Sequence, residues 1–230
     1  MLSTEQFKKD TFSALNNPQL RGNFKRAMSG LMQKRIAVFP DDQEFHQLSE
    51  IGRSTRTNGL QKLPELLQQL ESNCSKNGIQ VFWAETVEQA NQLVLEIAER
   101  HNAKSVVKGK SMVSEEMELN SFLEKHGIEA LEADLGEYII QSDHELPSHI
   151  IMPAIHKNKE QIAQLFHQKV EPSFFAESAE EMTAIARKVL RSKFYNADIG
   201  VSGVNFAVAE TGPLCLVENE GNGRFCTTLP

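Results

Sequence analysis

The first 78 residues carry apolar side chains at helical spacing and show no strand pattern. One helical stripe is formed by Phe24, Ala27, Met28, Leu31 and Ile36. Pro18 divides this helical stretch and Pro40 ends it. Two further helices are predicted from Asp42 to about Arg53 and from Leu60 to about Lys76. Residues 1–78 are therefore predicted to form an N-terminal helical arm.

From Ile79 onward, short apolar runs alternate with helical segments. Strands are predicted at 79–83, 105–107, 128–131 and 149–152, and helices at 86–101, 114–126, 136–141, 158–168 and 178–193. The helices at Thr86 and Ser178 begin with the pattern of a capping box, and Ser114 is the predicted cap of a third. This alternation predicts an α/β fold with a mainly parallel sheet covered by helices on both faces.

The last part of the chain adds antiparallel strands to this sheet. Segments 206–209 and 214–217 flank a Gly-Pro turn and are predicted to form a hairpin. A polar, glycine-rich loop follows at 218–224, and 225–228 is predicted to begin another strand. Residues 79–230 are therefore expected to be an α/β domain that is truncated at its C-terminal end.

Composition and charge narrow the classes of function. The chain has 24 Lys and Arg against 31 Asp and Glu, a formal charge of −7 that repels phosphate backbones and anionic lipid. No apolar run approaches the roughly 20 residues that span a bilayer, and the N-terminus does not resemble a signal peptide. A cytoplasmic protein is expected that neither binds nucleic acid nor inserts into a membrane.

Cysteine and histidine spacing gives no reason to expect a metal in this chain. The three cysteines are scattered without a Cys-x-x-Cys pair, so a disulfide framework, a zinc site and an iron–sulfur cluster have no support. His144, His149 and His156 lie within a short stretch, but no two of them have metal-ligand spacing. We expect neither a metal nor a cofactor in residues 1–230.

The first candidate ligand site follows the strand at 105–107. It comprises Lys108, Lys110, Ser111 and Ser114. Ligands of open α/β sheets bind beyond the carboxyl ends of strands, and two lysines beside a helix N-terminus favour a carboxylate or phosphate. The alternative is a solvated loop in which Ser114 only caps a helix.

The second candidate site is the polar tail. It comprises Asn205, Glu210, Thr211, Glu218, Asn219, Glu220, Asn222 and Arg224. The neighbouring glycines let the backbone approach a ligand closely, and a carboxylate here could act as a base or as a nucleophile towards an acyl group. The alternative is that Asn and Gly serve turn geometry and the charges solvate a loop. No residue is assigned a catalytic role.

Several long motifs together resemble a known family. They are Lys108–Asn120, Glu132–Gln141, Pro147–Lys157, Gly203–Gly212 and Val217–Arg224. These are similar to the lactate-utilisation (LUD) domain of LutB/YkgF-like iron–sulfur proteins, and the resemblance covers essentially the whole chain. It implies a fold of the NagB/RpiA/CoA-transferase-like group, which has a Rossmann-like, mainly parallel sheet with antiparallel additions. It also implies [4Fe–4S] clusters in a C-terminal ferredoxin-like region that this chain lacks, and action with LutA-like and LutC-like partners. It implies no catalytic residues.

Three classes of function are left open, one of them a pure interaction scaffold with the helical arm as its docking face. The first is the non-cluster domain of an electron-transfer subunit in a complex that oxidises L-lactate to pyruvate, with a small carboxylate or nucleotide as the ligand of its own pocket. The alternative is a CoA-transferase-like or small-anion-binding domain without a redox role. Glu218-Asn219-Glu220-Gly221 is similar to the Glu-Asn-Gly around the nucleophile of CoA-transferases, although the spacing differs. Whether this chain is an enzyme is left open.

Overall fold

The structure is a computed structural model that describes residues 3–109, 111–145, 147–148, 152–218 and 220–230. The chain forms two compact units, residues 1–52 with 139–183 and residues 53–138 with 184–230. The boundary expected between residues 78 and 79 stays a prediction.

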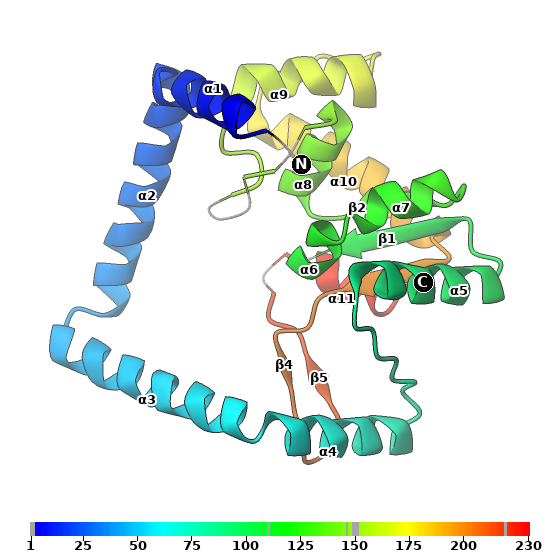
Figure 1. Ribbon diagram of the computed structural model, residues 1–230. Helices are drawn as coiled ribbons and strands as arrows, with labels where there is room; N and C mark the ends of the chain where they lie inside the picture. Colours follow the sequence, from blue (N-terminus) through cyan, green and yellow to red (C-terminus); the bar gives the residue numbers. More distant parts are fainter. Residues whose placement is uncertain (1–2, 110, 146, 149–151, 219) are drawn as a thin grey trace. The chain divides into compact units, whose positions relative to one another are not determined.

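The N-terminal segment is helical, as its apolar stripe predicts (Figure 1). The helices are α1 (Thr4–Leu15), α2 (Pro18–Val38), α3 (Asp42–Gln61) and α4 (Leu63–Lys76). The side chains of Ser3 and Asn17 cap α1 and α2 by accepting the N–H groups of Gln6 and Leu20. None of the described residues of α1, α2 and α3 is buried, so their apolar side chains are partly or fully exposed.

The unit of residues 1–52 and 139–183 also contains α9 (Lys159–Leu165) and the π-helical turn η1 (Phe166–Val170). Asn158 and Gln161 form a capping box at the start of α9. The helices α8 (Leu135–Asp143) and α10 (Ala179–Asn196) confirm two further predicted segments. Ser178 and Glu181 exchange hydrogen bonds at the start of α10, as the predicted capping box requires.

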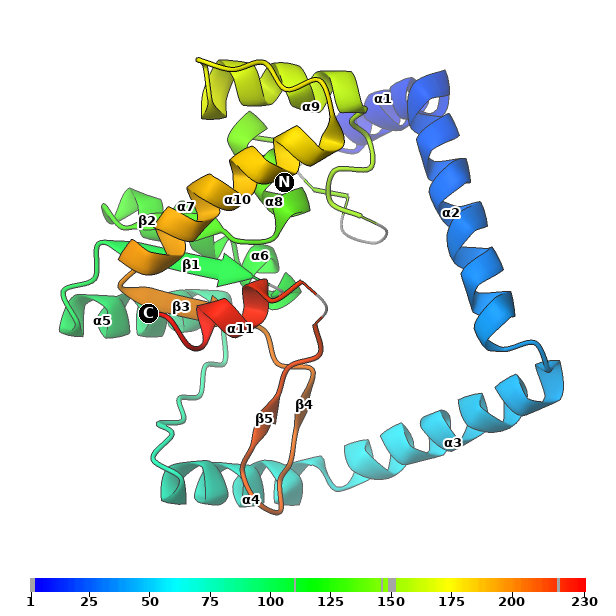
Figure 2. The ribbon, with the colours of Figure 1, turned by 180° about the vertical axis from the view of Figure 1, so that it is seen from behind.

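The unit of residues 53–138 and 184–230 is built around a parallel sheet (Figure 2). Its strands are β1 (Ser105–Gly109), β2 (Glu129–Glu132) and β3 (Ile199–Ser202), in the order β2-β1-β3. A separate antiparallel pair joins β4 (Phe206–Ala207) to β5 (Leu214–Cys215). The predicted α/β class, with a mainly parallel sheet and an antiparallel addition, is confirmed.

Alternate residues of β1 face two apolar layers. Val106 packs with residues of α5 (Val87–Arg100) and α7 (Leu119–Lys125), including Leu95 and Leu123. Val107 packs with Phe194 of α10 and Cys226 of α11 (Asn222–Cys226) on the other face. This alternation gives a sheet covered by helices on both sides, as the βαβ pattern predicts.

Two strand predictions are wrong. Residues 79–83 belong to no helix or strand, and Phe82 and Trp83 are exposed. The described parallel sheet consists of β2, β1 and β3 and does not include this segment, so its apolar residues are not buried by strand pairing. The segment 225–228 includes the end of α11 instead of a strand. The side chains of Thr227 and Thr228 donate to the carbonyl oxygen of Arg224, a local bond that a strand would not make.

Other predictions differ in extent or fall outside the described residues. The helix predicted at 114–126 is two helices, α6 (Met112–Glu116) and α7, because Glu118 between them is left-handed with φ +53°. The cap of α6 is Ser111, not the predicted Ser114. Of the strand predicted at 149–152, residues 149–151 lie outside the described residues, and Met152 is not in a strand. Strand β3 had no counterpart among the predictions.

Candidate functional site

An ion pair is buried where β1 and β2 end. The side chains of Lys108 and Glu132 are 1% and 6% exposed, and Lys108 Nζ lies 2.5 Å from Glu132 Oε1. The two residues are direct neighbours in the parallel register, and the side-chain amide of Asn120 on α7 donates to the same oxygen at 2.7 Å. A buried charge is tolerated when it is paired with an opposite charge and hydrogen-bonded. Lys108 and Glu132 pair with each other, and Glu132 also accepts the hydrogen bond from Asn120.

The strand pattern explains why these charges face inward. Val106 and Ala130 point into the layer between the sheet and α5 and α7. Side chains of a strand alternate, so Lys108 and Glu132, two residues further on, point to the same side. The pair therefore closes the apolar layer at the carboxyl end of the sheet, where ligands of such sheets bind.

Two more carboxylates join the pair. Glu115 lies on the short helix α6, and Glu137 lies in the first turn of α8. One carboxylate oxygen from each of Glu115, Glu132 and Glu137 lies within 4.8 Å of the other two. We call Lys108, Glu115, Glu132 and Glu137 the acidic cluster.

Burial and mutual repulsion change the acid strength of the acidic cluster. Desolvation raises the pKa of Glu137 to about 9, and the negative charge of Glu132 adds to the effect. Desolvation also raises the pKa of Glu115 to about 7, with Lys108 lowering it and Glu132 raising it. At neutral pH Glu137 therefore holds a proton and Glu115 exchanges one.

This arrangement suits proton exchange. A group with a pKa near 7 works both as an acid and as a base at cellular pH, and strongly shifted groups gather at functional sites. Three carboxylates at this spacing are also the oxygen ligands that a hard divalent cation takes. The ammonium of Lys108 already supplies a positive charge to Glu132.

The cysteines do not fit an iron–sulfur cluster. Cys74, Cys215 and Cys226 come from α4, β5 and α11, and within the described residues their sulfurs form no group at metal-sharing distance. Cys74 Sγ donates to the carbonyl oxygen of Gly212, and burial raises the pKa of Cys226 to about 12. An iron–sulfur cluster is held by several cysteine sulfurs together, and these three cysteines lie on three separate elements.

Part of the predicted tail site is held against α4 (Figure 1). Asn73 donates to the carbonyl oxygen of Glu210 at 3.0 Å, and Asn77 donates to that of Thr211 at 2.8 Å. Gly212 has φ +91°, and a Cβ on it would lie 2.7 Å from Asn77 Nδ2. The backbone of this turn therefore fixes the hairpin on α4, while the side chains of Glu210 and Thr211 are exposed.

Other predicted tail residues form local contacts. Asn205 Oδ1 accepts the N–H of Val217 at 2.8 Å. The side chain of Glu218 is 9% exposed, accepts the N–H of Arg224 at 3.2 Å and lies 3.5 Å from Arg224 Nε. These contacts support the turn-geometry alternative for Asn205 and Glu218.

Asn222 connects the tail with the acidic cluster. Its side-chain amide donates to Glu220 at 3.1 Å and to Asp134 at 3.3 Å. The charge of Asp134 in turn raises the pKa values of both Glu115 and Glu137, after the larger effects of burial. The structure thus brings Lys108, Glu220 and Asn222 to one region, and the ligand-binding roles of all the candidates stay predictions.

The remaining candidates surround α6. Ser111 accepts the N–H of Ser114 at 3.2 Å, and the hydroxyl of Ser114 donates to the carbonyl oxygen of Ser111 at 2.8 Å. Both serines therefore shape the turn that carries Glu115. Lys110 and Asn219 lie outside the described residues.

Glu115, Glu132 and Glu137 were not among the site residues predicted from the sequence. One signal was available, because Lys108 and Glu132 each end an apolar strand, and charged residues are almost never fully buried unless paired. Two neighbouring buried strands that end in opposite charges predict an ion pair. Glu115 and Glu137 carry no comparable signal because helix N-termini favour acidic residues in general.

Comparisons with known proteins agree with these motifs. Proteins named "Lactate utilization protein B" from Bacillus pumilus and Bacillus subtilis are 42% and 41% identical over 230 residues, covering 100% of this chain and 48% of theirs. The protein of that name from Geobacillus sp. WCH70 is 44% identical over 217 residues, 94% of this chain and 46% of its own. The chain thus spans about half the length of these relatives.

No solved structure matches the chain. Among the described residues, no helix is long and apolar enough to cross a membrane. The family profile described as "LUD domain" matches residues 67–230, which is more than half of the chain. The chain therefore belongs to the LUD-domain family.

Proposed function

We propose that the intact protein acts in L-lactate utilisation, as an iron–sulfur electron-transfer subunit of a complex that oxidises L-lactate to pyruvate. The present chain is the cluster-free front domain of that subunit. The observation that carries this proposal is the 41–42% identity along all 230 residues with proteins named "Lactate utilization protein B". The partners are LutA-like and LutC-like proteins, and the complex is cytoplasmic.

The acidic cluster gives this domain a chemical role. Oxidation of a hydroxyl group to a ketone releases protons as well as electrons. Glu115 and Glu137 hold exchangeable protons beside the Lys108–Glu132 pair, at the ligand-binding end of the sheet. We assign proton exchange to this cluster and electron transfer to the part of the protein outside this chain.

Growth on lactate tests the proposed function. A strain that lacks the intact gene should fail to grow on L-lactate and should still grow on pyruvate. The intact gene restores growth, and so does a Glu99→Gln version, since Glu99 is an exposed residue of α5. Undiminished growth of the deletion strain on L-lactate would contradict the function itself.

The role of the acidic cluster is tested in the same strain. An intact protein with Glu115→Gln keeps the shape of the side chain but loses the proton that Glu115 exchanges at neutral pH, so growth on L-lactate should slow. Equal growth with Glu115→Gln and Glu99→Gln would show that the acidic cluster takes no part in the reaction, while leaving the lactate function in place.

The proposed electron-transfer role must be tested on the intact protein. Anaerobic purification followed by iron and acid-labile sulfide assays should find iron–sulfur clusters, and LutA-like and LutC-like proteins should copurify. An intact protein without iron and sulfide would instead favour a ligand-binding or transferase domain. The transferase alternative predicts that acyl-CoA forms a glutamyl-CoA thioester at Glu218 or Glu220, which borohydride reduces to an alcohol with release of the CoA thiol. Against this alternative, the side chain of Glu218 is largely buried and contacts Arg224.

A further inference from the structure

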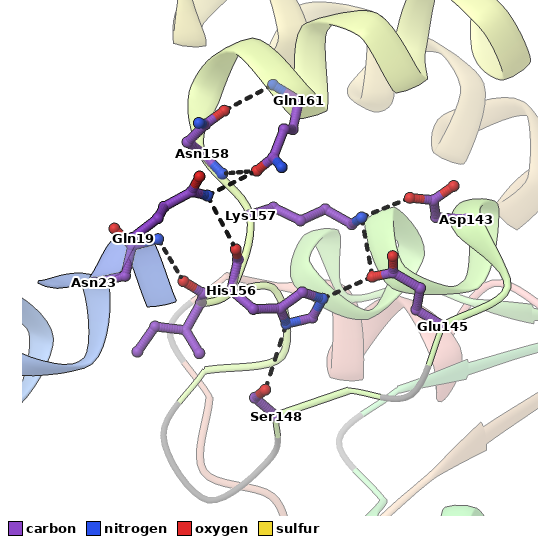
Figure 3. Close-up of polar contacts among 10 residues, drawn as sticks. Gln19, Asn23, Asp143, Glu145, Ser148, His156, Lys157, Asn158 and Gln161 are labelled. Carbon is purple, nitrogen blue, oxygen red and sulfur yellow. Dashed lines mark hydrogen bonds and ion pairs between the residues drawn. The ribbon is translucent and has the colours of Figure 1, made fainter. Parts of the chain in front are cut away.

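A second polar network lies in the unit of residues 1–52 and 139–183 and takes no part in the acidic cluster. Figure 3 shows the ring of His156 between Ser148 and Glu145. His156 Nδ1 lies 3.4 Å from Ser148 Oγ, and His156 Nε2 lies 2.7 Å from Glu145 Oε2. A hydroxyl, an imidazole and a carboxylate are thus arranged in a row.

The carboxylate of this row is held in its ionised form. Lys157, whose side chain is 8% exposed, places Nζ 2.9 Å from Glu145 Oε2 and 2.5 Å from Asp143 Oδ2. Partial burial raises the pKa of Glu145, but the hydrogen bonds from His156 and Lys157 outweigh it and leave the pKa below its usual value. An ionised Glu145 orients the imidazole and stabilises a positive charge on it.

The backbone on either side of the imidazole is also fixed. Asn23 of α2 donates to the carbonyl oxygen of Ile155 at 3.0 Å, and Gln19 donates to that of His156 at 3.4 Å. Gln19 also donates to Gln161 in the capping box of α9 at 3.0 Å. The imidazole is therefore held from both sides, which is the condition for a base to act at a fixed distance.

A serine, a base within hydrogen-bond reach and a group that orients the base are the parts of an activated nucleophile, and the first distance is often loose without substrate. We propose that Ser148, His156 and Glu145 form a nucleophilic serine site that accepts acyl groups from activated esters or thioesters. This site is independent of lactate utilisation. Ser148 and His156 are partly exposed, so a small acyl donor reaches them.

The step balances without a redox partner. Ser148 Oγ attacks the acyl carbon, its proton passes to His156 Nδ1, and a new C–O bond forms as the bond to the leaving alcohol or thiol breaks. The imidazolium then gives its proton to that leaving group. Water releases the acyl group by the same route and restores the free serine.

A fluorophosphonate probe tests this site directly. The serine oxygen forms a bond to phosphorus and fluoride leaves, so the adduct can be located by mass spectrometry of peptides from the whole chain. We expect the adduct on Ser148, no adduct there in Ser148→Ala, and labelling about 100-fold slower in His156→Gln, as loss of a general base implies. Ser173→Ala is the matched control, because Ser173 donates to Glu171 at 2.5 Å without a histidine in that bond.

A pH series on the unchanged chain separates chemistry from folding. Labelling should be slower in acid, since a protonated imidazole cannot accept the serine proton. The charged groups around the imidazole are Glu145, Lys157 and Asp143, and circular dichroism at each pH shows that the fold persists. Absence of an adduct on Ser148, a rate independent of pH, or an unchanged rate in a folded His156→Gln chain would each overturn the proposal.

Discussion

Replacing Glu137 by Gln tests whether a buried carboxyl group of the acidic cluster keeps its proton. The ordinary pKa of 4.5 applies to the unfolded chain, and burial raises the folded value to about 9. Between these values the folded chain binds a proton that the unfolded chain has released. The free energy of unfolding therefore falls as pH rises through this window, by about 1.4 kcal/mol per pH unit for one proton.

The expected size follows from that slope. Between pH 5 and pH 8, one fully buried group with this shift would lower the free energy of unfolding of the chain by about 4 kcal/mol. Glu137 is only partly buried, and solvent screening reduces the loss to about 2 kcal/mol. Gln cannot ionise, so Glu137→Gln should match the unchanged chain near pH 5 and exceed its stability by about 2 kcal/mol at pH 8.

Urea unfolding at pH 5, 6, 7 and 8 measures this difference. Far-UV circular dichroism and the fluorescence of Trp83, the one tryptophan of the chain, report the transition, and a shift in midpoint at constant slope reports stability. Glu99→Gln removes an exposed carboxylate and should leave the pH dependence unchanged. Parallel curves for Glu137→Gln and the unchanged chain would refute the reasoning, because they would show that Glu137 ionises normally.

Three more changes have expected outcomes that urea unfolding at neutral pH can check. Lys108→Met leaves Glu132 buried without its cation and should cost about 3–5 kcal/mol, much of which the double change with Glu132→Met should restore. Asn73→Ala removes the amide that donates to two hairpin carbonyls and should cost about 1–2 kcal/mol. Gly30→Ala in α2 should stabilise the chain by about 0.5–1 kcal/mol, since nothing lies within 4 Å of the added Cβ.

Each of these changes has a control of the same chemistry. Lys104→Met removes an exposed lysine next to β1 and should change stability little. Asn196→Ala removes an amide that donates to Ser192 within the same helix turn. Gly212→Ala should destabilise where Gly30→Ala stabilises, because φ at Gly212 is +91° and its Cβ would meet Asn77. Equal costs for Lys104→Met and Lys108→Met would contradict the buried ion pair.

Local signals predicted the helices and two strands of the parallel sheet. Capping residues such as Thr86 and Ser178 bond to a residue three positions later, so all parts of each cap can be recognised in a short piece of sequence. Strand β3 escaped prediction because Ile199-Gly200-Val201-Ser202 is short and contains a glycine, which weakens a strand pattern. A glycine is required at position 200 by a segment far away in the sequence. A Cβ on Gly200 would lie 1.6 Å from the carbonyl oxygen of Cys226 in α11.

Of the residues in the acidic cluster, only Lys108 was predicted from the sequence, because its position after a strand is a local signal. Lys108 was named from its place after a strand, and the structure finds it at the centre of the acidic cluster. Its environment was missed because Glu115, Glu132 and Glu137 come from three separate elements, and their meeting depends on tertiary packing. The expected anion site assumed that Lys108 faces a ligand, whereas its ammonium contacts Glu132.

The Lys108–Glu132 pair also bears on the architecture of the sheet. Lys108 pairs directly with Glu132 in the parallel register of β1 and β2. A slip of one residue would turn Glu132 to the opposite face, where Val107, Phe194 and Cys226 form an apolar layer. The charge would then be buried without a partner, at a cost of several kcal/mol. The same two residues therefore favour one register and supply the fixed charges of the acidic cluster, so the position of the site follows from the pairing that builds the sheet.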